Sequence, residues 1–187
     1  MSHSTPAEYS SEEREVLLRI AHGSIEAAAS GKEFTPEDVP THLQERRGAF
    51  TTIHLNGQLH GCVGYILPTL PLYLTVADTA ASAGTRDPRF PPLTPEEAKD
   101  VTVEISVLSK PFEIRPEEIE TGKHGLLVSD GRRRGLLLPQ VAPEHGWDAE
   151  QFLTHTCLKA RLPADAWRHG ARLEAFTAEI FGEEQRQ

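Results

Sequence analysis

A chain of 187 residues, of which 38% are hydrophobic, is long enough for one domain, or for two intimately packed lobes, with a real core. Its 19 basic and 28 acidic side chains give a net charge of −9, which disfavours binding to nucleic acid. The sequence has neither an apolar run as long as a transmembrane helix nor a secretion signal at its start, so we expect a cytoplasmic protein outside the membrane.

The first predicted element is a helix over residues 10–31. Ser10 and Glu13 have the spacing of a capping box, in which each side chain bonds the other residue's backbone amide. Apolar residues then recur at helical spacing, and Gly31 is expected to end the helix in the left-handed conformation.

A β-hairpin follows, because two short strand-like runs flank Asn56 and Gly57, the pair typical of a tight type I′ turn. This turn predicts three facing pairs: Leu55 with Gln58, Ile53 with His60, and Thr51 with Cys62. Because side chains alternate along a strand, His60 and Cys62 would share one face.

Two glycines, Gly61 and Gly64, bracket Cys62 in the second strand of this hairpin. Glycine inside a strand indicates either a bend or the close approach of another backbone or a ligand, and the sequence leaves both open.

The next segments are a helix over residues 72–83, ended by Gly84, and a proline-rich loop over residues 85–92. A short capped helix begins at Thr94, and strict alternation predicts a strand with one buried face over residues 101–108.

The second half repeats this plan. A hairpin turns at Asp130 and Gly131, a helix is capped by Asp148, and the last strand covers residues 173–181. Arg132, Arg133 and Arg134 are interpreted as a solvated hairpin tip. Each half thus contains a hairpin, a helix and a strand, which predicts a structural duplication in an α+β fold.

Cys62 is the first candidate for chemistry. A cysteine between glycines is either a small buried apolar residue or a nucleophile whose thiolate is favoured by a neighbouring cation, here His60. Cys157 lies on an apolar helical face and is interpreted as packing, with no disulfide to Cys62.

Arg86 and Arg89 flank Asp87 in the proline-stiffened loop, where they would recognise an anionic group or be tied to Asp87 and to backbone carbonyls. Glu104 points from the polar side of its strand and is either solvent-facing or a proton-transfer group.

Two further candidates come from the second half. His124 stands near Gly122 and Gly125 and would be a general base, a metal ligand or a turn residue bonded to backbone. Gln140 ends a buried strand, where its amide could bond exposed backbone.

Nine histidines raise the question of a metal, but no metal-ligand spacing occurs, so the sequence predicts no metal site. Phosphate-loop, dinucleotide-binding and serine-hydrolase motifs are also absent, and the residues do not indicate a cofactor.

Several motifs together resemble the AMMECR family, whose bacterial and archaeal members are called AmmeMemoRadiSam system protein A. They extend from the first helix to the last strand: Gly48-Ala-Phe-Thr-Thr52, the segment from Gly57 to Gly64, Asp87-Pro-Arg-Phe90, Glu104-Ile-Ser-Val-Leu-Ser109, Gly122-Lys-His-Gly125, Leu138-Pro-Gln-Val-Ala142, Gly146-Trp147 and Cys157-Leu-Lys-Ala160. The family's hallmark Leu-Arg-Gly-Cys-Ile-Gly is here Leu59-His-Gly-Cys-Val-Gly64, so His60 replaces an arginine.

The resemblance implies a single domain over residues 1–187, with two repeated hairpin–helix–strand units around one barrel-like, mostly antiparallel sheet. It also implies a shared pathway with a Memo-like protein and a radical S-adenosylmethionine enzyme, without specifying a reaction.

Two hypotheses of function follow. The first is a small-molecule-binding protein or enzyme with a polar cleft between the repeats, lined by Cys62, Arg89 and His124 with His60 at its edge. In it the arginines and His60 bind an anionic small molecule, and Glu104 and His124 transfer protons. The second is a non-catalytic adaptor for the same protein partners, with Cys62 structural.

Overall fold

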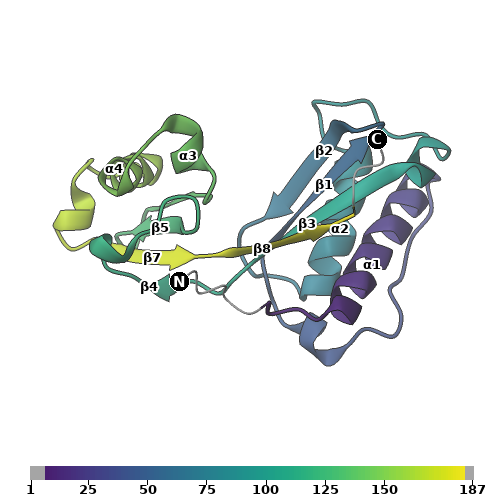
Figure 1. Ribbon diagram of the computed structural model, residues 1–187, viewed down its shortest axis with the longest axis horizontal. Coiled ribbons are helices and arrows are strands. Elements are labelled where there is room, and N and C mark those ends of the chain that lie inside the picture. The colour runs from purple at the N-terminus through teal and green to yellow at the C-terminus, as the bar shows by residue number, and fades with distance from the viewer. Residues whose placement is uncertain (1–6, 184–187) are drawn as a thin grey trace. The chain divides into compact units, whose positions relative to one another are not determined.

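A computed structural model describes residues 7–183, which divide into two units (Figure 1). The first unit contains the described residues up to Leu108 and those from Glu179 onward, and the second runs from Ser109 to Ala178. None of the helices in residues 7–183 is both long enough and apolar enough to cross a membrane.

The first unit is a four-stranded sheet with two helices on one face. The strands run in the order β2-β1-β3-β8, and their bounds are Ala49–Leu55 for β1, Gln58–Tyr65 for β2, Val101–Leu108 for β3 and Ala178–Gly182 for β8. Helices α1 (Ser11–Ala29) and α2 (Leu72–Thr85) pack on each other and on this sheet, as Figure 1 shows. Short 3-10 turns cover Thr41–Gln44 and Glu97–Lys99.

The apolar core of the first unit lies between these helices and the sheet. Ile53, Val103 and Ile105 are almost fully buried on the helix side, together with Leu17 and Val76 from the two helices. Because side chains alternate along a strand, the residues between them point to the opposite face. Phe50, Thr52 and Glu104 are accordingly half-buried or exposed, so the second face of the sheet is the open one.

The ends of α1 are fixed by the predicted motifs. Ser10 and Glu13 form the capping box, and Gly31 adopts a φ of 66° just beyond the helix. The amides of Gly31 and Lys32 donate to the carbonyls of Ala28 and Ala27, which is a Schellman motif. The helix therefore matches the prediction, with bounds one to two residues shorter.

The predicted hairpin is present, but its register is corrected by a bulge. Asn56 and Gly57 have φ values of 53° and 75°, as the tight turn requires, and Leu55 faces Gln58. The register then shifts between His54 and Ile53, so His60 is an extra residue without a partner on β1. Ile53 pairs with Gly61 and Thr52 with Cys62, so the predicted pairs Ile53–His60 and Thr51–Cys62 are wrong.

The prediction that Gly84 ends the second helix is also wrong. Helix α2 continues to Thr85, and Gly84 is a buried residue within it, close to the side chains of Leu93 and Ile25. The carbonyl of Gly84 accepts the amide of Leu93 at 2.9 Å. This glycine is used for close packing, and the helix stops because Pro88 disfavours helical backbone at the preceding residue.

The second unit has its own four-stranded sheet, in the order β4-β7-β5-β6. The bounds of its elements are Phe112–Glu113 for β4, Gly125–Ser129 for β5, Arg134–Leu137 for β6, Arg172–Phe176 for β7, Val141–His145 for α3 and Ala149–Lys159 for α4, with 3-10 turns at Pro116–Glu118 and Ala166–Arg168. Asp148 and Gln151 form a capping box for α4, whose buried face includes Phe152 and Cys157.

The predicted duplication of element order is visible in the strand order of the two sheets. In the first unit β1 lies between β2 and β3, and in the second unit β5 lies between β6 and β7. The fourth strand of each sheet comes from the chain just after a strand of the other sheet. Strand β4 of the second sheet follows β3 of the first, and β8 of the first sheet follows β7 of the second. The prediction of a single barrel-like sheet is wrong. The strands form two separate open sheets with antiparallel pairing, and each unit combines its sheet with helices.

Candidate functional site

The open face of the first sheet brings three polar side chains into one row. Thr52 on β1 pairs with Cys62 on β2 and with Glu104 on β3. Directly opposite residues project from the same face, so all three side chains lie on the open side. The hydroxyl of Thr52 donates a hydrogen bond to Cys62 Sγ at 3.2 Å. Cys62 is half-buried and Glu104 is exposed.

The outer edge of β2 is held by Asp87 from the loop after α2. The backbone amide of Cys62 donates to Asp87 Oδ2 at 3.0 Å. Arg89 donates to the same carboxylate from its backbone amide at 3.1 Å, from Nε at 3.0 Å and from Nη2 at 2.7 Å. These hydrogen bonds, those of Arg89 foremost, hold the pKa of Asp87 well below its usual range although its side chain is 3% exposed.

Arg89 therefore pairs with Asp87, which is one of the two alternatives that the sequence left open; the other was recognition of an anionic group. Its Nη2 also reaches the carbonyl of Cys62 at 3.4 Å. The hydrogen bond to Asp87 raises the pKa of Arg89, and the thiol of Cys62 adds to this electrostatically. The Arg89 side chain is still 55% exposed, so the ion pair with Asp87 presents donor surface beside Cys62 to a ligand.

His60 and Arg86 are engaged elsewhere on the same unit. The bulge turns His60 toward the loop, where its ring stacks on Phe90 at 5.7 Å and Nε2 bonds the carbonyl of Pro91 at 3.0 Å. The guanidinium of Arg86 donates to Asp78 and Ser82 of α2, and within residues 7–183 its side chain makes no hydrogen bond to Asp87.

The glycine beside Cys62 brings the backbone of α2 close to β2. A Cβ atom on Gly61 would lie 2.0 Å from the carbonyl oxygen of Ala83. The segment thus contains both features that the sequence left as alternatives, a bulge at His60 and a close approach at Gly61. Gly64, in contrast, lies under the ring of Phe50.

His124 and Gln140 belong to the second unit. His124 is 7% exposed, its Nδ1 accepts the backbone amide of Glu120 at 3.0 Å, and its ring meets Phe112 edge-on. Burial lowers the pKa of His124, with a further contribution from Lys123. This is the geometry of a neutral turn residue. Gln140 is exposed, and within residues 7–183 its side-chain amide has no hydrogen-bond partner.

Cys62, Glu104 and Arg89 are thus brought together on one unit, with His60 and Arg86 engaged in contacts of their own. The cleft that would add His124 stays a prediction. Sequence reasoning missed Thr52 and Asp87. Thr52 could be found only with the strand register beyond the bulge. Asp87 stands in the Asp87-Pro-Arg-Phe90 motif, but it was considered only as a partner of the neighbouring arginines.

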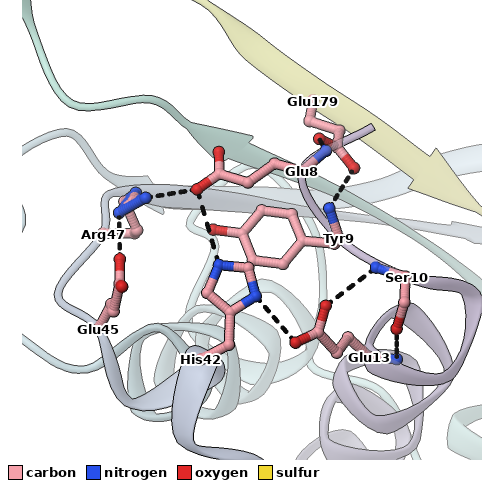
Figure 2. A network of polar contacts seen from close by, with 8 residues as sticks. All are labelled: Glu8, Tyr9, Ser10, Glu13, His42, Glu45, Arg47 and Glu179. Carbon is pink, nitrogen blue, oxygen red and sulfur yellow. Dashed lines mark hydrogen bonds and ion pairs between the residues drawn. The ribbon is translucent and has the colours of Figure 1, made fainter. Parts of the chain in front are cut away.

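A second polar cluster joins the N-terminal segment to the start of the sheet (Figure 2). Glu8, His42 and Glu45 offer ligand atoms within 4.8 Å of one another, the one such group among residues 7–183. The buried guanidinium of Arg47 pairs with both Glu8 and Glu45, and His42 Nδ1 bonds Glu13 at 2.8 Å while its ring stacks on Tyr9. Because Arg47 already supplies the positive charge between these carboxylates, the cluster is interpreted as an ion-pair network.

Comparison with known proteins identifies relatives over nearly the whole chain. The sequence profile of the AMMECR1 family matches residues 18–181. A protein of Methanothermobacter thermautotrophicus is 45% identical over 95% of this chain and 98% of its own length, and Protein MJ0810 of Methanocaldococcus jannaschii is 42% identical over 92% of this chain and 90% of its own. The crystal structure of the uncharacterized protein PH0010 from Pyrococcus horikoshii is 41% identical, with a TM-score of 0.74 over 94% of this chain and 93% of that one. The chain belongs to the AMMECR1 family.

Proposed function

We propose that this chain is a small-molecule-binding protein or enzyme whose site is centred on Cys62. The observation that supports the proposal is the row of Cys62, Thr52 and Glu104 on the open face of the sheet, with Arg89 fixed at its edge. Cys62 is half-buried and does not belong to the apolar core of this unit among the described residues.

The chemistry of the row divides the roles of its members. The hydroxyl of Thr52 stabilises negative charge on Cys62 Sγ through its hydrogen bond. Arg89 binds an anionic group of the ligand with the exposed part of its guanidinium. Glu104 is two strands away from Cys62, about 10 Å between Cα atoms, so it moves a proton on the bound molecule and not on the thiol.

The partners implied by the family resemblance complete the proposal. The protein acts in the cytoplasm with a Memo-like protein and a radical S-adenosylmethionine enzyme, and it binds or converts an anionic small molecule of their shared pathway. His60, Arg86, His124 and Gln140 remain further binding or proton-transfer candidates in this proposal.

The test is untargeted metabolite capture. The purified protein is incubated with a metabolite extract, separated from free compounds and measured by mass spectrometry, alongside Cys62→Ser, Arg89→Gln and the matched control Cys157→Ser. We expect an anionic compound that is retained by the wild type and by Cys157→Ser and is lost from the other two. Equal retention by Cys62→Ser would remove the cysteine from the site.

A second candidate, the adaptor, is favoured by one observation. Tyr65 ends β2, Ile66, Leu67 and Leu70 follow it, and these four residues expose 38–51% of their surface. Exposed apolar residues in one segment are typical of protein contacts. In this case Leu67→Ser would abolish complex formation with a Memo-like protein or a radical S-adenosylmethionine enzyme, whereas Cys62→Ser would retain it.

A further inference from the structure

A hollow on the second unit lies where the β5–β6 hairpin meets the segment after α4. Its volume is about 730 Å³, and it is lined by residues 129–134 together with parts of the segment from Leu162 to Arg172. Pockets that hold small ligands typically measure about 300–1,000 Å³. The hollow is therefore large enough for a metabolite, and it lies within one unit.

Its wall is basic, in a chain with a net charge of −9. Four arginines line the hollow, Arg132, Arg133, Arg134 and Arg172, against the two carboxylates of Asp130 and Asp165. The local excess of positive charge runs against the composition of the whole protein.

Within the β5–β6 turn, Arg133 and Asp130 of this wall bond each other. The guanidinium of Arg133 donates to Asp130 Oδ2 from Nε at 3.1 Å and from Nη2 at 2.9 Å, and its Nη1 donates to the carbonyl of Arg161 at 2.8 Å. Backbone amides of Arg133 and Arg132 lower the pKa of Asp130 to about 2, so this carboxylate stays ionised and neutralises Arg133. Arg133 therefore fits the interpretation as a hairpin tip, and Asp130 does not offset the other arginines.

Two of the remaining arginines have no internal partner. Within residues 7–183, no side chain or carbonyl bonds the guanidinium groups of Arg132 or Arg134. Arg172 pairs with the buried Glu174 at 3.1 Å and with Glu113 at 4.0 Å, and its side chain is still 63% exposed. Asp165 pairs with His169 at 3.2 Å.

The strand register aligns two of these arginines around a hydroxyl. Ser129 on β5 pairs with Arg134 on β6 and with Arg172 on β7. The three side chains thus project from the same face of the sheet, with the two arginines about 10 Å apart at Cα. Guanidinium groups on either side of a serine hydroxyl suit a tetrahedral anion with several acceptor oxygens.

The other lining residues indicate the rest of the ligand. Leu162, Pro163, Ala166 and Ala171 contribute an apolar part of the wall, which suits an organic body attached to the anion. A long nucleic acid is disfavoured, because the hollow is local and the remainder of the chain repels a polyanion.

We propose that this hollow binds a phosphorylated small molecule, with its phosphate held by Arg132, Arg134 and Arg172 beside Ser129. The site is separate from Cys62 and does not depend on the function proposed above. It adds a second ligand, of defined chemistry, to the second unit of the protein.

Inorganic pyrophosphate is the probe for this site. Isothermal titration calorimetry at low ionic strength on the full chain should give saturable, one-to-one binding. The double variant Arg132→Gln/Arg134→Gln should raise the dissociation constant by about tenfold or more, since charge-assisted hydrogen bonds to the anion are lost. Because neither guanidinium has an internal partner, the variant should melt at the wild-type temperature.

The control is Arg115→Gln, which removes one positive charge from the same unit at an exposed arginine outside the hollow. It should change the dissociation constant less than twofold. Amide shifts in nuclear magnetic resonance should localise to residues 129–134 and 162–172.

Four outcomes would overturn the proposal. They are an absence of saturable pyrophosphate binding, equal binding by the double variant and the wild type, equally tight binding of succinate as a carboxylate probe, and tighter binding of a short oligothymidylate that the double variant loses. The last outcome would assign the basic wall to single-stranded nucleic acid instead.

Discussion

The carboxylate of Asp87 accepts the backbone amide of Cys62 at 3.0 Å, and this contact fixes the edge of the strand that carries the thiol. Strand β2 is outermost in its sheet, so its outward amides have no neighbouring strand to bond. Asp87 supplies an acceptor at Cys62, and Arg89 holds that carboxylate in place. The position of the candidate nucleophile therefore depends on a residue outside its own hairpin.

Replacing Asp87 with asparagine should destabilise the protein and disturb the site. The change keeps the shape but removes the charge that accepts four hydrogen bonds. We expect a loss of about 2 kcal/mol in the free energy of unfolding at neutral pH, measured by urea denaturation. The rate at which Cys62 is alkylated should change as well, because the backbone amide of Cys62 loses the carboxylate that accepts its hydrogen bond.

The pH dependence of this effect has a defined sign. The folded-state pKa of Asp87 is held below its unfolded value of about 3.9, so its contribution is present above that pH and declines as the pH falls. The stability difference between wild type and Asp87→Asn should therefore be largest above about pH 4 and shrink in acid. Asp100→Asn, at an exposed aspartate of the same unit, is the control and should show no comparable difference.

Gly61→Ala should be strongly destabilising, because the new methyl group would meet backbone. The nearest atom is the carbonyl oxygen of Ala83 at 2.0 Å, so β2 and α2 would have to separate. We expect a loss of about 3 kcal/mol by chemical denaturation. Gly64→Ala is the paired control, since the atoms nearest to its methyl group belong to the ring of Phe50, a side chain that can rotate away, and not to backbone. Equal losses for the two variants would argue against the close approach at Gly61.

The elements predictable from sequence were those fixed by local contacts. The capping boxes at Ser10 and Asp148, the left-handed Gly31 and the Asn56-Gly57 turn involve residues within a few positions of one another, and all are present. The duplicated order of elements follows from the same local signals.

The features that escaped prediction depend on distant contacts. Gly61 and Gly64 indicate a bend as one alternative, but alternation alone does not tell at which residue a bulge is inserted, and the bulge at His60 shifts the register by one residue. Gly84 has the composition of a helix end, yet its place is set by packing against Leu93 and Ile25. Closure of the strands into one sheet was inferred from the family resemblance, and pairing between β4 and β7 and between β3 and β8 forms two sheets instead.

His124 should make the stability of the protein sensitive to mildly acidic pH. Its folded-state pKa lies below the ordinary value of about 6.5, so its contribution is present above that pH and is lost as the pH falls and protonation favours the unfolded chain. The unfolding free energy of His124→Asn should therefore fall less than that of the wild type between about pH 7 and pH 5. His169→Asn, at an exposed histidine of the same unit, should follow the wild type. Parallel pH profiles for all three would show that His124 titrates normally.

Thiol alkylation should distinguish the two cysteines, which are both free. Cys157 is fully buried, and burial raises the pKa of its thiol, whereas Cys62 is half-buried on the open face. Native protein treated with iodoacetamide should gain one adduct by intact mass, Cys62→Ser none, and unfolded wild type two. Thr52→Val removes the hydroxyl that bonds Sγ and should slow the native reaction by about fivefold, as expected for the loss of one hydrogen bond of about 1 kcal/mol. Thr102→Val, on the same face without a contact to Cys62, should leave the rate unchanged. If Cys62 stays inert until the protein unfolds, it is a packing residue, and the proposed site has no nucleophile.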